Sequence, residues 1–89
     1  MQTQAEFTIE TLTAALEYRQ KEVWQHQINI DNFRLAIAEI EKEHQGKIHM
    51  EAYADRMREL LLSALQEQEK EQLLVSVIKA RLEEHTCSR

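Results

Sequence analysis

The segment EKEHQG, residues 41–46, decides which fold this chain can adopt. Gly46 is the only glycine in the 89 residues, and there is no proline. Glycine takes a positive φ without steric cost, so Gly46 is the natural C-terminal cap of a preceding helix. Lys42 and His44 carry basic groups that suit the negative end of a helix dipole. The sequence therefore predicts a single turn, over about residues 45–48, between two long helices.

The composition favours long helices on both sides of this turn. Ala, Leu, Glu, Lys and Arg make up about half of the chain, a share that is typical of long helices and coiled coils. We expect the first helix over about residues 8–44, with Thr8 as its N-cap and with Phe7 and Leu12 as a hydrophobic staple. The second helix is expected over about residues 49–85, followed by a frayed tail at 86–89. All of this belongs to one domain, residues 1–89.

A seven-residue repeat of apolar positions runs through the first helix. Its two rows are Ile9, Leu16, Val23, Ile30 and Ile37, and Leu12, Arg19, His26, Phe33 and Ile40. Such a seam predicts that the helix packs lengthwise against another helix, as in a coiled coil. With a short turn after it, the fold class is all-α: a long antiparallel helical hairpin.

The second helix carries seven consecutive polar residues, QEQEKEQ at 66–72, between two apolar parts. Counting outward from Gly46, facing residues of an antiparallel hairpin have numbers that sum to about 92–94. Arg19 then lies near Glu71. His26 then lies near Glu67. We predict that these two pairs form a polar layer, which fixes the register of the helices while weakening the core.

The segment VWQHQINIDNFRL, residues 23–35, carries apolar residues on two sides of a helix. At about 100° per residue, one set falls nearly opposite the seam, and the second helix repeats this pattern. We call this set the second-face residues: Trp24, Ile28 and Leu35 in the first helix, and Leu62, Leu73 and Val77 in the second. A two-helix hairpin has one inner seam and cannot bury both sides. We therefore predict that two hairpins form a homodimer, an elongated four-helix bundle, or that a different protein covers the second face.

The same segment allows one alternative. Asn29, Asp31 and Asn32 prefer caps and turns, so a helix break with a new helix from Asp31 is conceivable. The seven-residue phase continues unbroken to Ile37, which favours a continuous helix.

Side chains that could carry catalysis or hold a metal are scattered. No two of the four histidines, at 26, 44, 49 and 85, stand four residues apart on one helix face, whereas zinc needs three or four close ligands. His85 and Cys87 are close in sequence but fall at the end of the chain. There is no phosphate-binding loop and no nucleophile elbow. We expect no catalytic residue, no metal site, no cofactor and no enzymatic activity.

The charge balance and the cysteine count indicate the setting. The net charge of −5 disfavours binding to nucleic acid and to anionic membranes. One cysteine cannot form an intrachain disulfide, which favours a reducing compartment. The first ten residues do not resemble a secretory signal, and the longest apolar run, LLL at 60–62, is far short of the roughly 18 residues that span a bilayer. We expect a soluble cytoplasmic protein that does not enter a membrane.

These features together favour a non-catalytic protein–protein interaction module. It would be a small adaptor, assembly factor or inhibitor that binds a larger cytosolic protein machine. The alternative is a regulator that acts on nucleic acid, either a helical dimer that binds RNA or DNA or an acidic mimic that inhibits a nucleic-acid enzyme. Sixteen Asp and Glu residues could present spaced negative charge in such a mimic, although eleven Lys and Arg residues dilute it.

Overall fold

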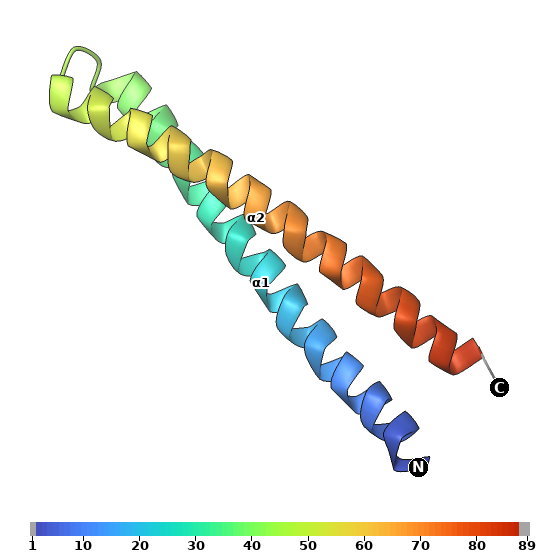
Figure 1. Ribbon diagram of the computed structural model, residues 1–89. Helices are drawn as coiled ribbons and strands as arrows, with labels where there is room; N and C mark the ends of the chain where they lie inside the picture. Colours follow the sequence, from blue (N-terminus) through green and yellow to red (C-terminus); the bar gives the residue numbers. More distant parts are fainter. Residues whose placement is uncertain (1, 88–89) are drawn as a thin grey trace.

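Two long helices joined by a short turn make up the computed structural model (Figure 1). Helix α1 spans Gln2–Glu43 and helix α2 spans Ile48–Cys87. The structure describes the backbone of residues 2–87 and the side chains of residues 8–86. The helices pack along each other in an antiparallel hairpin whose Cα atoms extend over 66 × 18 × 14 Å. The predicted all-α helical hairpin is confirmed.

The turn forms where the glycine predicts it. The backbone N–H of His44 donates to the carbonyl of Ile40 at 2.9 Å, and that of Lys47 donates to the carbonyl of His44 at 3.2 Å. Gly46 is the third residue of this turn and has a φ of 84°, as a type II β-turn requires at that position. Its N–H donates to a carboxylate oxygen of Glu51 at 2.9 Å. A side chain of α2 therefore satisfies the backbone of the turn.

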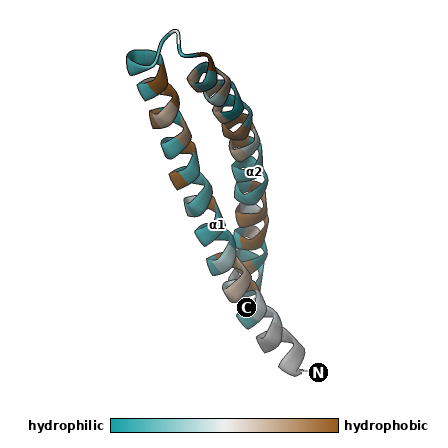
Figure 2. Ribbon diagram, turned by 90° about the vertical axis from the view of Figure 1, so that its left-hand side faces the viewer, coloured by the Kyte–Doolittle hydropathy of each residue, from teal (hydrophilic) through white to brown (hydrophobic). Residues whose placement is uncertain are grey.

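The core is a single seam of side chains between the two helices. On α1, Leu12, Ile30 and Ile40 are buried, and Ile30 is the most deeply buried of them. On α2 the buried and half-buried residues also recur every seven positions, in the rows Met50, Met57, Ala64, Glu71 and Ile78, and Ala54, Leu61, Gln68, Val75 and Leu82. Hydrophobic and hydrophilic residues alternate in short blocks along both helices (Figure 2). Within residues 2–87, no helical stretch is both long and apolar enough to span a membrane.

Helix α1 begins earlier than the sequence predicts. It starts at Gln2 rather than at Thr8, so the prediction of Thr8 as the N-cap is wrong. Residues 2–7 contain neither glycine nor proline, and nothing in them stops the helix from extending past Thr8. The side chain of Phe7, and with it the predicted staple to Leu12, lies outside the described side chains.

Helix α2 continues beyond the predicted end at residue 85. It includes Thr86 and Cys87, so the predicted end at residue 85 is two residues short, and residues 88–89 lie outside the described part of the chain. The hydroxyl of Thr86 donates to the carbonyl of Glu83 at 3.0 Å. This bond gives a partner to one of the carbonyls that a helix end leaves free.

Helix α1 is continuous through residues 29–32, which excludes the predicted alternative of a break there. Gln25 Nε2 donates to Asn29 Oδ1 at 3.4 Å, and Gln27 Nε2 donates to Asp31 Oδ1 at 3.0 Å. These bonds between side chains four residues apart occupy acceptors that would otherwise compete for the helix backbone. The poorer helix formers are thereby accommodated inside a long helix.

Substitution of Gly46 tests the turn. A Cβ at this position meets no atom within 4 Å, so alanine adds only the strain of a positive φ. We expect Gly46→Ala to lower the free energy of unfolding by about 1–2 kcal/mol, and Gly46→Asn to lower it less, because asparagine tolerates the left-handed region better. Urea unfolding followed by circular dichroism measures both changes. Gln45→Ala, at an exposed neighbour with a negative φ, is the control; a Gly46→Ala variant as stable as that control contradicts the turn geometry.

Candidate interaction surfaces and the polar layer

An ion pair crosses the seam midway along the hairpin. Arg19 Nη1 of α1 lies 2.9 Å from Glu71 Oε1 and 3.2 Å from Glu71 Oε2 of α2. This is the Arg19–Glu71 contact that register counting predicts. The side chain of Arg19 is 36% exposed and that of Glu71 is 16% exposed. Arg19 also places its guanidinium carbon 5.3 Å from the centroid of the Tyr18 ring, within cation–π distance.

Gln68 is the buried polar residue of this layer. Gln68 is only 8% exposed. Gln68 Nε2 donates to the carbonyl of Val23 at 3.2 Å and to Gln27 Oε1 at 2.9 Å, both on α1. Among the described residues, no buried side-chain nitrogen or oxygen lacks a hydrogen-bond partner. A single amide therefore ties α2 to one level of α1.

The predicted pair between His26 and Glu67 does not form. Glu67 Oε2 instead accepts from Lys70 Nζ at 2.9 Å on the outside of α2, and His26 is half-buried at the edge of the seam. Gln68 takes the seam position because it stands seven residues after Leu61 and seven before Val75. That spacing is the signal in the sequence that identifies Gln68 rather than its neighbour.

A second ion-pair cluster lies near the turn. Arg58 Nη2 lies 2.8 Å from Glu41 Oε2 across the two helices, and Arg58 Nη1 lies 2.8 Å from Asp55 Oδ1 on α2. The hydrogen bond that Arg58 donates to the Glu41 carboxylate is the main cause that raises the pKa of the Arg58 guanidinium above its ordinary value. This arginine therefore stays charged and links the two helices close to where they join.

The second-face residues of α1 point away from the seam. Trp24 is 66% exposed and Leu35 is 69% exposed. Ile28 differs from the prediction because it is half-buried. Ile28 stands four residues after Trp24, and residues four apart are neighbours on a helix surface. The side chain of Trp24 therefore lies next to Ile28 and is placed to cover part of it.

The second-face residues of α2 are open as well. Leu62 is 58% exposed and Leu73 is 63% exposed, and Val77 is also an exposed hydrophobic residue. The hairpin thus leaves large apolar side chains on the outside of both helices, as the two-sided pattern predicts.

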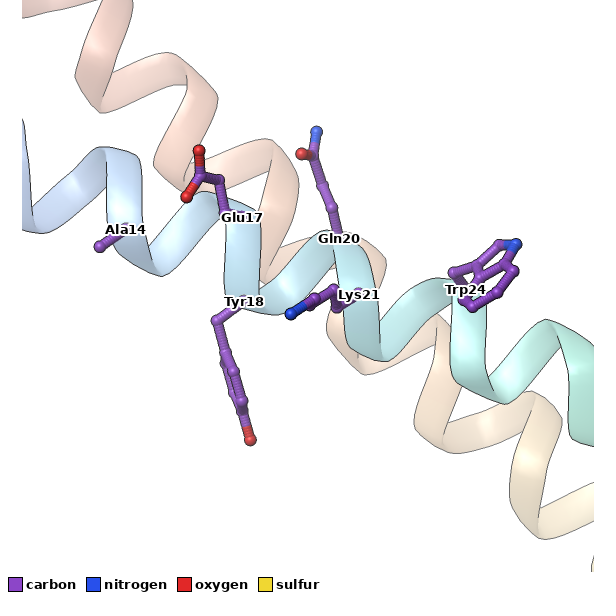
Figure 3. A pocket seen from close by; sticks show the side chains of 6 residues that line it. All are labelled: Ala14, Glu17, Tyr18, Gln20, Lys21 and Trp24. Carbon is purple, nitrogen blue, oxygen red and sulfur yellow. The ribbon is translucent and has the colours of Figure 1, made fainter.

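A shallow depression of about 650 Å³ runs along the outer side of α1. Its lining residues, shown in Figure 3, are Ala14, Glu17, Tyr18, Gln20, Lys21 and Trp24. All come from one helix, and Lys21 lies along that helix between Tyr18 and Trp24 (Figure 3). An open hollow on one helix suits side chains of another protein better than it suits a small molecule, which needs an enclosed site.

The surfaces of the described residues carry no grouped ligands for a metal. Within the described residues, no three His, Cys, Asp or Glu side chains come together as a metal site.

No family model matches the chain, and neither a curated protein nor a solved structure matches it. The surfaces are therefore interpreted from their own residues.

Substitution of Gln68 separates register from stability. Gln68→Leu leaves no buried group without a partner, because the Val23 carbonyl lies within a helix and Gln27 is exposed. We expect Gln68→Leu to raise the free energy of unfolding by about 1 kcal/mol, and Gln68→Ala, which leaves a void, to lower it. We also expect Gln68→Leu to populate a second register, visible as additional amide resonances in a heteronuclear NMR spectrum. A single set of resonances for Gln68→Leu contradicts the register role.

A double-mutant cycle measures the ion pair across the seam. For Arg19→Ala and Glu71→Ala we expect a coupling free energy of about 0.5–1 kcal/mol, since Arg19 is partly exposed to screening solvent. The exposed Arg56–Glu59 pair on α2 is the matched control, and we expect its coupling to be about 0.3 kcal/mol. Equal coupling free energies in both cycles would mean that the position of Glu71 in the seam does not strengthen its ion pair with Arg19.

Proposed function

We propose that this chain is a non-catalytic protein–protein interaction module. It acts as a small adaptor, assembly factor or inhibitor of a larger protein machine. Two hairpins associate as an elongated four-helix assembly, and an apolar strip that remains outside this assembly binds the larger protein.

The observation that carries the proposal is the second-face residues. Single exposed apolar residues are common on any protein surface, but here Trp24 and Leu35 on α1 are matched by Leu62 and Leu73 on α2. Tryptophan is enriched among the residues that dominate binding energy at protein interfaces. Exposed apolar strips of this kind favour a surface that another protein covers.

The polar chemistry of the hairpin supports a binding role rather than a reacting one. The buried amide of Gln68 and the Arg19–Glu71 pair are satisfied by hydrogen bonds within the chain. Catalytic carboxylates need a cleft that sets their pKa values apart, whereas the depression on α1 is open to one side. The module therefore offers its partner shape and apolar contacts.

The proposed setting is the cytosol. A chain with one cysteine gains no intrachain disulfide from an oxidising compartment. A partner there would meet a module with a net charge of −5, which keeps the unbound form from associating non-specifically with acidic surfaces.

A regulator that acts on nucleic acid is less well supported. Arg19, Arg56 and Arg58 already pair with carboxylates of the same chain, so a phosphate would have to compete with these carboxylates for the guanidinium groups. Gel shifts with RNA and with DNA at two salt concentrations separate the two functions, because phosphate contacts weaken steeply with salt. Salt-sensitive binding would favour the regulator over the adaptor.

Capture of partners from native lysate, followed by mass spectrometry, tests the proposed function. We expect Leu62→Ala combined with Leu73→Ala to weaken capture of the main partner about tenfold or more, because truncated interface anchors cost more than 1 kcal/mol each. We expect Trp24→Ala combined with Leu35→Ala to abolish either the dimer or a partner contact. Both variants should keep the helicity of the wild type in circular dichroism.

Ile48→Ala is the matched control, since Ile48 is an exposed apolar residue next to the turn and not a second-face residue. This control should capture the same partners as the wild type. If both double variants retain the wild-type partners and oligomeric state, the assignment of these surfaces is wrong.

A further inference from the structure

The outer side of α1 carries a second row of residues spaced alternately by four and three. We call it the outer row: Glu10, Ala14, Glu17, Lys21, Trp24, Ile28, Asp31, Leu35, Ala38 and Lys42. This spacing follows one side of a helix in the same way as the heptad seam. Apart from the half-buried Ile28, every member is exposed. The outer row is therefore a ready second seam that faces away from α2.

The charges of the outer row are complementary to the same row read in the opposite direction. Two α1 helices can run antiparallel with residue 26 of each at the same level. Glu10 then faces Lys42 of the second copy, and Lys21 faces Asp31 of the second copy. Two-fold symmetry repeats each pair, because the contact of one residue with another is returned by the partner. Four pairs of opposite charge result.

The apolar members of the outer row match in the same arrangement. Trp24 faces Ile28 of the second copy, next to the two-fold axis, and Ala14 faces Ala38. In the one pair of facing positions not yet described, Leu35 of one copy faces Glu17 of the other, beside the exposed ring of Tyr18. The depression lined by Ala14, Tyr18 and Trp24 thus lies opposite the apolar side chains of the second copy.

A parallel arrangement of the two α1 helices fails on charge. Each residue of the outer row would then face itself, so that Glu10, Glu17, Lys21, Asp31 and Lys42 would all meet a like charge. Like charges that face each other on packed helices are destabilising. The outer row therefore favours the antiparallel pairing alone.

Helix α2 has no such row. Its corresponding outer positions are Ala52, Asp55, Glu59, Leu62, Gln66, Glu69, Leu73, Ser76, Ala80 and Glu83. They include four acidic residues and no basic one, so two copies of this row repel each other. Leu62 and Leu73 are consequently left for a partner other than this chain.

The basic members of the outer row have no ion-pair partner among the described residues of their own chain. Lys21 and Lys42 form no ion pair with any side chain that the structure describes, whereas Arg19, Arg56 and Arg58 do. Their charges are available for the carboxylates of a second copy.

The exposed area of the hairpin is large enough for an interface with a second copy. A compact monomer of 10.6 kDa exposes about 5,500 Å² by the usual scaling with mass, whereas this chain exposes 6872 Å². The excess of about 1,400 Å² is larger than the roughly 800 Å² that each partner contributes to a standard stable interface. The hairpin has enough surplus surface for a lasting dimer.

We propose that the outer row is a homodimer interface in which the α1 helices of two copies pair antiparallel about a two-fold axis near residue 26. The α1 helices form the centre of the four-helix assembly, and the α2 helices lie on the outside. The strip with Leu62, Leu73 and Val77 then faces solvent on both sides and is available to the larger protein. The role of that strip rests on the proposed function, whereas the pairing of α1 rests on the outer row.

Charge exchange between Lys21 and Asp31 tests the pairing. We expect Lys21→Glu and Asp31→Lys each to raise the dissociation constant of the homodimer about tenfold or more, because each creates two like-charge contacts. The chain that carries both changes should dimerise like the wild type. Sedimentation equilibrium measures the dissociation constants, and circular dichroism checks that each variant remains helical. Lys79→Glu, an exposed charge change on α2, is the control and should leave the dimer unchanged.

Mixing the two single variants gives the sharpest readout. In a mixed pair, Glu at position 21 faces Lys at position 31, and the unchanged Lys21 faces the unchanged Asp31, so both levels are again opposite in charge. We expect native mass spectrometry of an isotopically labelled mixture to show the heterodimer in large excess over both homodimers. A statistical mixture, homodimers insensitive to Lys21→Glu, or a monomeric wild type would overturn the pairing.

The pairing of α1 and the binding of a larger protein can fail separately. If the wild type is monomeric but Leu62→Ala with Leu73→Ala abolishes partner capture, the α1 pairing is wrong and the interaction module stands. If the mixed variants form heterodimers but no partner is captured, the pairing stands and the module's role in binding a larger protein is wrong.

Discussion

The buried amide of Gln68 is the contact on which the rest of the hairpin depends. A purely apolar seam that repeats every seven residues does not by itself favour one register, since each level resembles the next. Gln68 removes this equivalence because its bonds to the Val23 carbonyl and to Gln27 exist at one level only. Arg19 and Glu71 add an ion pair one turn away. The register that results decides which outer residues of α1 and α2 stand at the same height.

The second constraint is geometric. Two helices enclose one seam, and they cannot bury apolar side chains that lie on opposite sides of each helix. The exposed Trp24 and Leu35 on α1, and the exposed Leu62 and Leu73 on α2, are the direct consequence. The two outer surfaces differ in charge pattern. The charged residues in the outer row of α1 include both acids and the bases Lys21 and Lys42, whereas the charged residues in the corresponding row of α2 are all acidic. We infer that one surface serves a second copy and the other serves a different protein.

Much of the fold follows from a few residues of the sequence. Gly46 fixes the turn, and the seven-residue rows of α1 fix the side that packs, because both depend on local geometry. The Arg19–Glu71 contact follows from counting along two straight rods. The start of α1 could not be predicted from Thr8, because a capping residue acts only where the preceding residues do not continue the helix. The predicted His26–Glu67 pair is wrong because the heptad spacing of α2, rather than charge attraction, determines which side chain faces α1, and this spacing places Gln68 there.

Small-angle X-ray scattering tests the side-by-side dimer that this pairing builds, because it yields molecular mass and longest dimension together. With residue 26 of both α1 helices at the centre, each turn lies beside the N-terminal part of the other α1, and the two hairpins overlap almost completely. The expected particle has twice the 10.6 kDa of one chain and is only slightly longer than a single hairpin, whose Cα atoms extend over 66 Å. A particle with the mass of one chain, or one of doubled mass that is nearly twice as long as the hairpin, would contradict the pairing.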